Sequence, residues 1–139
     1  MKVITRRLSL KTKGELDIID ITNDVESAVR EIGVKNGTVT VFAPGSTGGV
    51  TTIEYESGLL KDFPAMLERV IPKNIEYEHE KRWHDGNGHS HVRASLLGPS
   101  ITVPIEEGRL TLGTWQQLVF VEFDNRSRRR ELVLQIMGE

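Results

Sequence analysis

The chain contains no cysteine, and this absence excludes several kinds of chemistry. Without thiols there can be no disulfide, no thiolate nucleophile and no cysteine-ligated zinc. The chain also lacks an apolar run long enough to span a bilayer. Its first seven residues become charged at once, where a secretion signal would need an apolar core. We therefore expect no membrane association and a cytoplasmic location.

A charge excess of either sign is also missing. The formal net charge is −2 at pH 7, so no overall field favours nucleic acid or an anionic membrane, and we predict neither as a partner. Internal repeats, low-complexity segments and linkers are absent as well. A chain of 139 residues suits one hydrophobic core, and we predict a single domain over residues 1–139.

The apolar pattern predicts an α+β fold. Its clearest helix has one apolar stripe at i, i+3, i+4 and i+7, made by Val25, Ala28, Val29 and Ile32. Asn23 is placed to cap this helix, with Glu26 three residues on, and Gly33 to end it. A second helix is expected over residues 58–70, broken near Pro64, and a third over residues 92–97.

Strands alternate with turns over most of the remaining chain. We expect them at residues 3–10, 16–21, 37–43, 50–55, 101–105, 110–123 and 131–137, with Trp115 in the core. Residues 73–88 are predicted to form a long polar loop. The expected order is ββαββααβββ, and its hairpins favour a mainly antiparallel sheet with helices on one side.

All four histidines of the chain fall within thirteen consecutive residues. They are His79, His84, His89 and His91. Imidazole is the commonest side-chain ligand for zinc and similar ions, so we predict these four as ligands of about one zinc-like ion per chain. His79 and His84 are one residue too far apart for an H-E-x-x-H motif, which excludes that class of metalloprotease. A solvated, histidine-rich loop is the alternative.

The spacing of His89 and His91 leaves their joint role open. Two residues apart, their side chains point away from each other on a helix and the same way in extended chain. Gly86 and Gly88 favour extended or turn geometry, so both histidines can be ligands if the helix begins after them. Otherwise one of them is a cap or a surface residue.

Other candidate site residues surround this segment. Asp85 and Glu54 are candidates for activating a metal-bound water, and Arg93 for contacting a phosphate. The loop Gly45-Ser46-Thr47 can present backbone N–H groups to a phosphate, or it is only a tight connection. We assign Asn87 to the same ligand-binding set.

Four arginines follow the last turn, at Arg126, Arg128, Arg129 and Arg130. Such a group is usually a solvated hairpin or an ion-pairing surface. The sharper alternative is a role in holding phosphates or the carboxylates of a partner.

Several runs of the chain resemble the YjbQ-like family. The longest is residues 85–100, DGNGHSHVRASLLGPS. Shorter matching runs are LGTWQ at 112–116, EFD at 122–124, RRR at 128–130 and VLQIMG at 133–138, together with Tyr77-x-His79. Together these runs extend the resemblance over essentially the whole chain.

The resemblance implies a half-barrel-like α+β fold, a homotrimer or a multiple of three, and a histidine-lined metal site. It also implies secondary thiamine-phosphate synthase activity, which joins hydroxymethylpyrimidine diphosphate to a thiazole phosphate and releases pyrophosphate. Glu54 stands at a position that matches the family. Many members carry Pro-His-Thr-Thr where this chain has Pro44-Gly45-Ser46-Thr47. We expect His84 to replace that missing imidazole in the metal pocket.

Three functions follow as hypotheses. The first is the thiamine-phosphate synthase, an enzyme with a small phosphorylated substrate. Its diphosphate favours magnesium, whereas three or four histidines favour a zinc-like ion. The second is a metal-dependent hydrolase, and the third is a metal- or ligand-binding trimer without catalytic activity.

Overall fold

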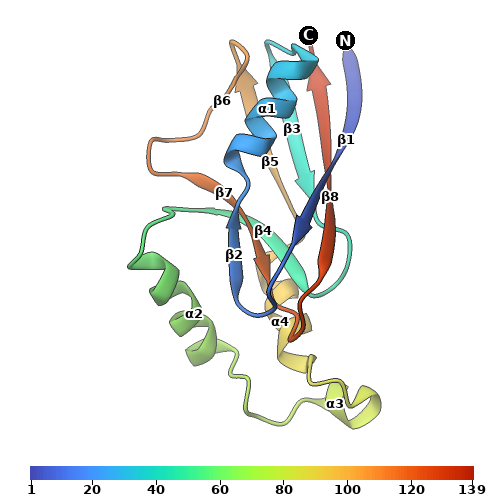
Figure 1. Cartoon of the computed structure of the whole chain (residues 1–139), viewed down its shortest axis with the longest axis vertical. Coiled ribbons are helices and arrows are strands. Elements are labelled where there is room, and N and C mark those ends of the chain that lie inside the picture. The colour runs from blue at the N-terminus through green and yellow to red at the C-terminus, as the bar shows by residue number, and fades with distance from the viewer.

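The computed structural model describes residues 1–139 and contains two antiparallel sheets (Figure 1). The strands are β1 (Lys2–Lys11), β2 (Asp17–Asp20), β3 (Gly37–Phe42), β4 (Gly48–Ile53), β5 (Ser100–Glu106), β6 (Arg109–Leu110), β7 (Gln117–Glu122) and β8 (Arg129–Gly138). The helices are α1 (Thr22–Ile32), α2 (Leu59–Val70), α3 (Glu78–Trp83) and α4 (Gly88–Leu97). One sheet has the strand order β1-β8-β3-β5-β6 and the other β2-β7-β4.

The central strand of the smaller sheet is buried on both faces. Leu118 and Phe120 of β7 belong to the main core, together with α1 and the larger sheet. Val119 and Val121 face the other way and pack with residues of α2 and α4 in a second core. The predicted α+β fold, with antiparallel sheets curled into a half-barrel, is therefore confirmed.

Helix α1 follows the sequence prediction except at its first residue. Its predicted apolar stripe is buried, and Gly33 ends the helix in the left-handed conformation at φ 80°. The helix begins at Thr22, before the predicted cap Asn23, and the Thr22 N–H donates to the Asp20 carboxylate at 3.0 Å. Asp20, which precedes the helix, thus accepts the hydrogen bond at its N-terminus that we expected Asn23 to accept.

The other differences fall in the middle of the chain. Residues 73–88 contain helix α3 as well as loop, and α4 begins at Gly88 instead of residue 92. Helix α2 runs without a break past Pro64. The expected strand 110–123 is two strands, and Trp115, expected in the core, is 73% exposed in the loop between them. The two-residue β6 and the separate β7 add one strand to the predicted order.

Helices α2, α3 and α4 gather at the end of the molecule opposite the two termini (Figure 1). The turns that join β1 to β2 and β7 to β8 reach the same end. None of the helices combines the length and the apolar character needed to cross a membrane. The candidate site residues near α3 and α4 are therefore surrounded by connections from both sheets.

Candidate metal centre

Three side chains from the segment α3–α4 converge on one point. His79 lies in α3, Asp85 in the turn after it and His91 in α4, and one ligand atom from each lies within 4.8 Å of the others. His79 Nδ1 is 3.4 Å from Asp85 Oδ1, and the two imidazole ring centres are 4.5 Å apart. We call these residues the histidine–aspartate cluster.

The donor set of the cluster fits a divalent transition-metal ion. Metal–nitrogen bonds of about 2.0–2.1 Å place neighbouring tetrahedral ligand atoms roughly 3.3 Å apart, close to the distance between His79 and Asp85. Both histidines are half-buried and Asp85 is exposed, so small side-chain rotations can close the remaining gaps. Two imidazoles and one carboxylate leave coordination positions free for water or substrate.

The ring of His91 is oriented by the loop between β3 and β4. Its Nδ1 lies 3.1 Å from the carbonyl oxygen of Ser46, which can only accept a hydrogen bond. Nδ1 therefore carries the proton of the neutral ring, and Nε2 keeps the lone pair that a metal ion needs.

Glu80 ties the beginning of α4 to the cluster. Its Oε1 accepts the Gly88 N–H at 2.7 Å and lies 3.3 Å from His79 Nδ1. One carboxylate thus fixes the first turn of the helix that carries His91 and contacts the imidazole of His79.

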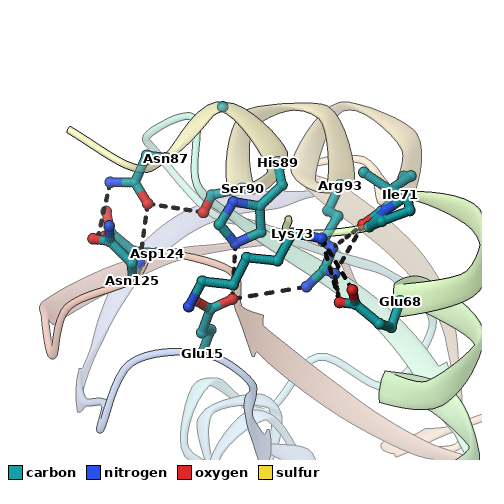
Figure 2. A network of polar contacts seen from close by, with 12 residues as sticks. Glu15, Glu68, Ile71, Lys73, Asn87, His89, Ser90, Arg93, Asp124 and Asn125 are labelled. Atoms are coloured by element: carbon teal, nitrogen blue, oxygen red, sulfur yellow. Dashed lines mark hydrogen bonds and ion pairs between the residues drawn. The ribbon is translucent and has the colours of Figure 1, made fainter. Parts of the chain in front are cut away.

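His89 belongs to a different group of residues (Figure 2). Its Nε2 lies 2.9 Å from Glu15 Oε2, and Glu15 Oε1 lies 2.7 Å from the Lys73 ammonium. Arg93, one helical turn after His89, lies 3.8 Å from Glu15 and donates to the Ile71 carbonyl. His89 and Arg93 are each 2% exposed. We call Glu15, His89 and Arg93 the buried network.

Burial raises the pKa of the Glu15 carboxyl, but its partners reverse the effect. Hydrogen bonds and charges from Lys73 and His89 favour the carboxylate, and together they hold its pKa below the ordinary value of 4.5. A second carboxylate, from Glu68, accepts from Arg93 at 2.9 Å. The charges of the buried network are therefore paired within the protein.

The helical geometry of α4 explains why the two histidines separate. Because the helix begins at Gly88, His89 and His91 are about 200° apart around its axis. The expectation that both are ligands of one ion is corrected: His91 joins the cluster, and His89 and Arg93 face the interior. Arg93 is therefore a structural anchor and not the phosphate contact that we expected.

His84 is not brought to the cluster, which corrects the expectation that it fills the place left by Gly45. It ends α3 in the left-handed conformation at φ 52°, and its side chain is exposed. Gly45 itself has φ 110°, a conformation that a histidine adopts only with strain. The backbone of this chain is thus built for glycine at position 45, and the third side chain of the cluster is Asp85.

Asn87 acts within the protein and not on a ligand. It is 4% exposed, accepts from the Ser90 hydroxyl and the Asn125 N–H, and donates to Asp124 Oδ1 at 3.3 Å. Burial raises the pKa of Asp124, but the Arg126 N–H, Thr47, Asn87 and Arg128 outweigh it and lower the pKa below 3.8. These contacts join the loop of the cluster to the turn between β7 and β8.

The loop Gly45-Ser46-Thr47 is divided between two roles. The Thr47 hydroxyl donates to Asp124 at 3.0 Å and accepts from Arg130 at 2.8 Å, and Arg130 pairs with the buried Glu122. The Thr47 side chain is therefore buried and bonded within the protein, whereas Gly45 and Ser46 are exposed.

Glu54 lies away from the cluster. It is exposed and directly follows Ile53, the last residue of β4, whereas Ser46, which touches His91, precedes the first residue of that strand. The length of β4 thus separates Glu54 from His91, and the structure does not bring it to the site.

Sequence reasoning missed four carboxylates that build this region. Glu15 and Glu80 carry no pattern that marks them. Glu122 and Asp124 did leave a signal, because they interrupt an otherwise apolar strand just before the arginines. A charged residue at such a position indicates a buried partner of opposite sign.

The sequence and fold match known proteins over nearly their whole length. The family model described as "UPF0047 protein YjbQ-like" matches residues 6–139. A UPF0047 protein of Archaeoglobus fulgidus is 41% identical over 126 residues, covering 91% of this chain and 96% of its own. The UPF0047 protein YugU of Bacillus subtilis is 36% identical, covering 96% and 98%.

Solved structures agree with the sequence comparison. A YbjQ-like protein from Sulfolobus solfataricus, described as of unknown function, superposes with a TM-score of 0.94 at 32% identity, covering 99% of both chains. A YjbQ/UPF0047 protein from Clostridium acetobutylicum has a TM-score of 0.86 at 41% identity, covering 95% of this chain and 99% of its own. On this evidence the chain belongs to the UPF0047, or YjbQ-like, family.

Proposed function

We propose that this protein is a metal-dependent enzyme that holds one zinc-like divalent ion at the histidine–aspartate cluster and acts on a small phosphorylated substrate. The observation that carries the proposal is the convergence of His79, Asp85 and His91, whose ligand atoms lie within 4.8 Å of one another. Two imidazoles favour a zinc-like ion over magnesium, which prefers oxygen ligands.

The residues around the cluster support it as a preorganised site. Ser46 orients the His91 ring through Nδ1, and the Asn125 amide donates to the Asp85 carbonyl at 2.8 Å. Metal sites typically hold their ligands through such outer contacts. A bound ion would supply Lewis acidity and an acidified water at this position.

Asp85 takes a different role from the one its sequence position suggested. In the cluster it serves as a ligand, together with the two histidines, and not as a free general base. The substrate and its reacting bond are then held by the open coordination positions and by the exposed residues Gly45 and Ser46 beside His91.

Metal analysis of untagged protein tests the proposal. We expect about one ion per chain for the wild type and for His84→Ala, and a loss of stoichiometric metal in His91→Ala and Asp85→Ala. His84→Ala is the matched control because it removes an exposed imidazole of the same segment that lies outside the cluster. Full occupancy in His91→Ala, or loss of metal in His84→Ala, would contradict the proposal.

The family resemblance names the first reaction to assay. Metal-loaded and metal-stripped protein would be incubated with hydroxymethylpyrimidine diphosphate and thiazole phosphate, and thiamine phosphate measured. We expect product with the loaded wild type and none with Asp85→Ala. With the same resemblance we propose a trimer or a multiple of three, and a light-scattering mass of one chain would refute that assembly.

A further inference from the structure

A group of cations lies where β1 and β8 meet the turn after β7. The group consists of Arg7, Lys11, Arg128 and Arg129, and we call it the basic rim. Arg7 pairs with Glu131 at 3.2 Å, and Arg128 lies 3.5 Å from Asp124. Lys11 and Arg129 have no carboxylate within ion-pairing distance.

Lys11 and Arg129 are placed against each other. They are directly opposite in the antiparallel pairing of β1 with β8, so their side chains share one face of the sheet. Like charges at such a position repel and destabilise the sheet. The nearest carboxylate in the hollows is that of Glu131, and it pairs with Arg7. A pair of cations without an ion-pairing partner of its own is expected where an anionic ligand supplies the missing charge.

The surface around this pair is hollowed. Three adjoining hollows, of about 480, 400 and 260 Å³, share Arg129 in their walls. Arg7, Arg128 and Gly45 line the largest, and Lys11 lines the other two. The largest falls within the usual volume range of small-molecule sites.

The basic rim and the histidine–aspartate cluster are connected through neighbouring residues of one loop and one turn. Asn125, in the turn that leads to Arg128, holds the Asp85 carbonyl. On the other side, Gly45 lines the largest hollow, and the next residue, Ser46, contacts His91. The two groups therefore border the same loop and the same turn.

We propose that the basic rim is a phosphate-binding site that takes the phosphate or diphosphate end of the substrate while its reacting end reaches the cluster. The assignment of this end to the substrate of the cluster rests on the proposed function. Arg129 and Lys11 provide the free charges, and Arg128 adds an exposed guanidinium able to bind two phosphate oxygens at once.

Calorimetric titration with inorganic pyrophosphate tests the site in protein stripped of metal with EDTA. The variant Lys11→Gln/Arg129→Gln should bind pyrophosphate about tenfold or more weakly than the wild type. The matched control is Lys35→Gln/Arg109→Gln, which removes the same charge from another hollow of about 570 Å³ and from residues that likewise form no ion pair.

We expect the control to bind within about twofold of the wild type. Equally weakened pyrophosphate binding in both double variants would show general attraction to positive charge, and this result would overturn the proposal. The absence of pyrophosphate binding to the wild type would also overturn it. Melting temperature gives a second readout. Because the substitution relieves repulsion, Lys11→Gln/Arg129→Gln should melt no lower than the wild type, and a clear loss of stability would assign the pair a structural role and overturn the proposal.

Asp85→Ala separates this proposal from the proposed function. It should lose stoichiometric metal and still bind pyrophosphate like the wild type. Pyrophosphate binding in a wild type that takes up no metal would contradict the metal-dependent function and leave the phosphate site standing. Metal uptake by a wild type that does not bind pyrophosphate would contradict the phosphate site and leave the metal-dependent function standing.

Discussion

His89 and His91 stand two residues apart on α4, and their surroundings differ in nearly every respect. His89 is 2% exposed and meets the carboxylate of Glu15, which also contacts Lys73 and Arg93. His91 is half-buried, and only one of its ring nitrogens has a protein partner. One histidine is thus committed to the interior, and the other keeps a lone pair for a ligand.

The difference shows how to separate structural from functional residues in one motif. A buried polar group whose partners all come from the protein stabilises the fold, and its removal leaves those partners unpaired. A half-exposed group beside others of its kind, with an unused donor atom, is available to bind. The buried network and the histidine–aspartate cluster should therefore respond to mutation in opposite ways.

The largest effect is expected in the buried network, from Arg93→Ala. This change leaves the Ile71 carbonyl without its donor and Glu68 without its cation, whereas Glu15 keeps Lys73. Because Glu68 is 56% exposed, most of the cost comes from the unpaired carbonyl and from the lost packing of a buried side chain, and we expect a loss of about 2–4 kcal/mol of unfolding free energy, measured by urea denaturation. The exposed Arg126→Ala is the control and should change stability by less than about 0.5 kcal/mol. Similar values for the two variants would contradict the structural role of Arg93.

A smaller effect is expected from acid. The pKa of Glu15 is lower in the folded protein than its ordinary value of 4.5, so its contribution to stability is complete above that value and is lost as the pH falls through the folded pKa. Glu15→Gln should therefore be less stable than the wild type at pH 7 and lose less stability below about pH 5.

Urea midpoints at pH 7, 5 and 4 would measure this convergence. Glu54→Gln is the control, because the Glu54 side chain is exposed and makes no hydrogen bond or ion pair, and this variant should follow the wild-type profile. Profiles of Glu15→Gln and wild type that stay parallel would show that Glu15 does not carry the acid sensitivity.

The smallest effect is expected at His84, the histidine that belongs to neither group. Its φ of 52° suits glycine better than a residue with a side chain. His84→Gly should raise the unfolding free energy by less than about 1 kcal/mol, because relief of strain is partly offset by added freedom of the unfolded chain. The metal content should stay unchanged, and a lower metal content would indicate that His84 is a metal ligand.

The sequence predicted the fold and the segment that holds the histidine–aspartate cluster, but not which histidines come together in it. Apolar periodicity marked α1 and most strands, because burial on one face follows regular spacing. It did not mark α3, a short helix of six mostly polar residues, and it began α4 four residues late. Those errors affected the grouping of the histidines, since the start of α4 determines whether residues 89 and 91 face together or apart.

The partners of the site were beyond sequence reasoning for a physical reason. Glu15 meets His89 across 74 positions of the chain, and Thr47 meets Asp124 across 77. No local spacing encodes contacts of this kind, which depend on how the two sheets pack. The arginine turn was visible in the sequence, but the different surroundings of its members were not. Side chains alternate along β8, so Arg130 is buried against Glu122 while Arg129 is exposed.

The most direct test compares His89→Gln with His91→Gln in one set of experiments. Metal content and urea stability of metal-free protein would be measured for both variants. We expect His89→Gln to keep about one ion per chain and to lose about 2 kcal/mol of stability, because a buried bond to a charged group is broken. We expect His91→Gln to lose the ion and to stay within about 0.5 kcal/mol of the wild type. Loss of metal in His89→Gln together with full occupancy in His91→Gln would contradict this division of the two histidines.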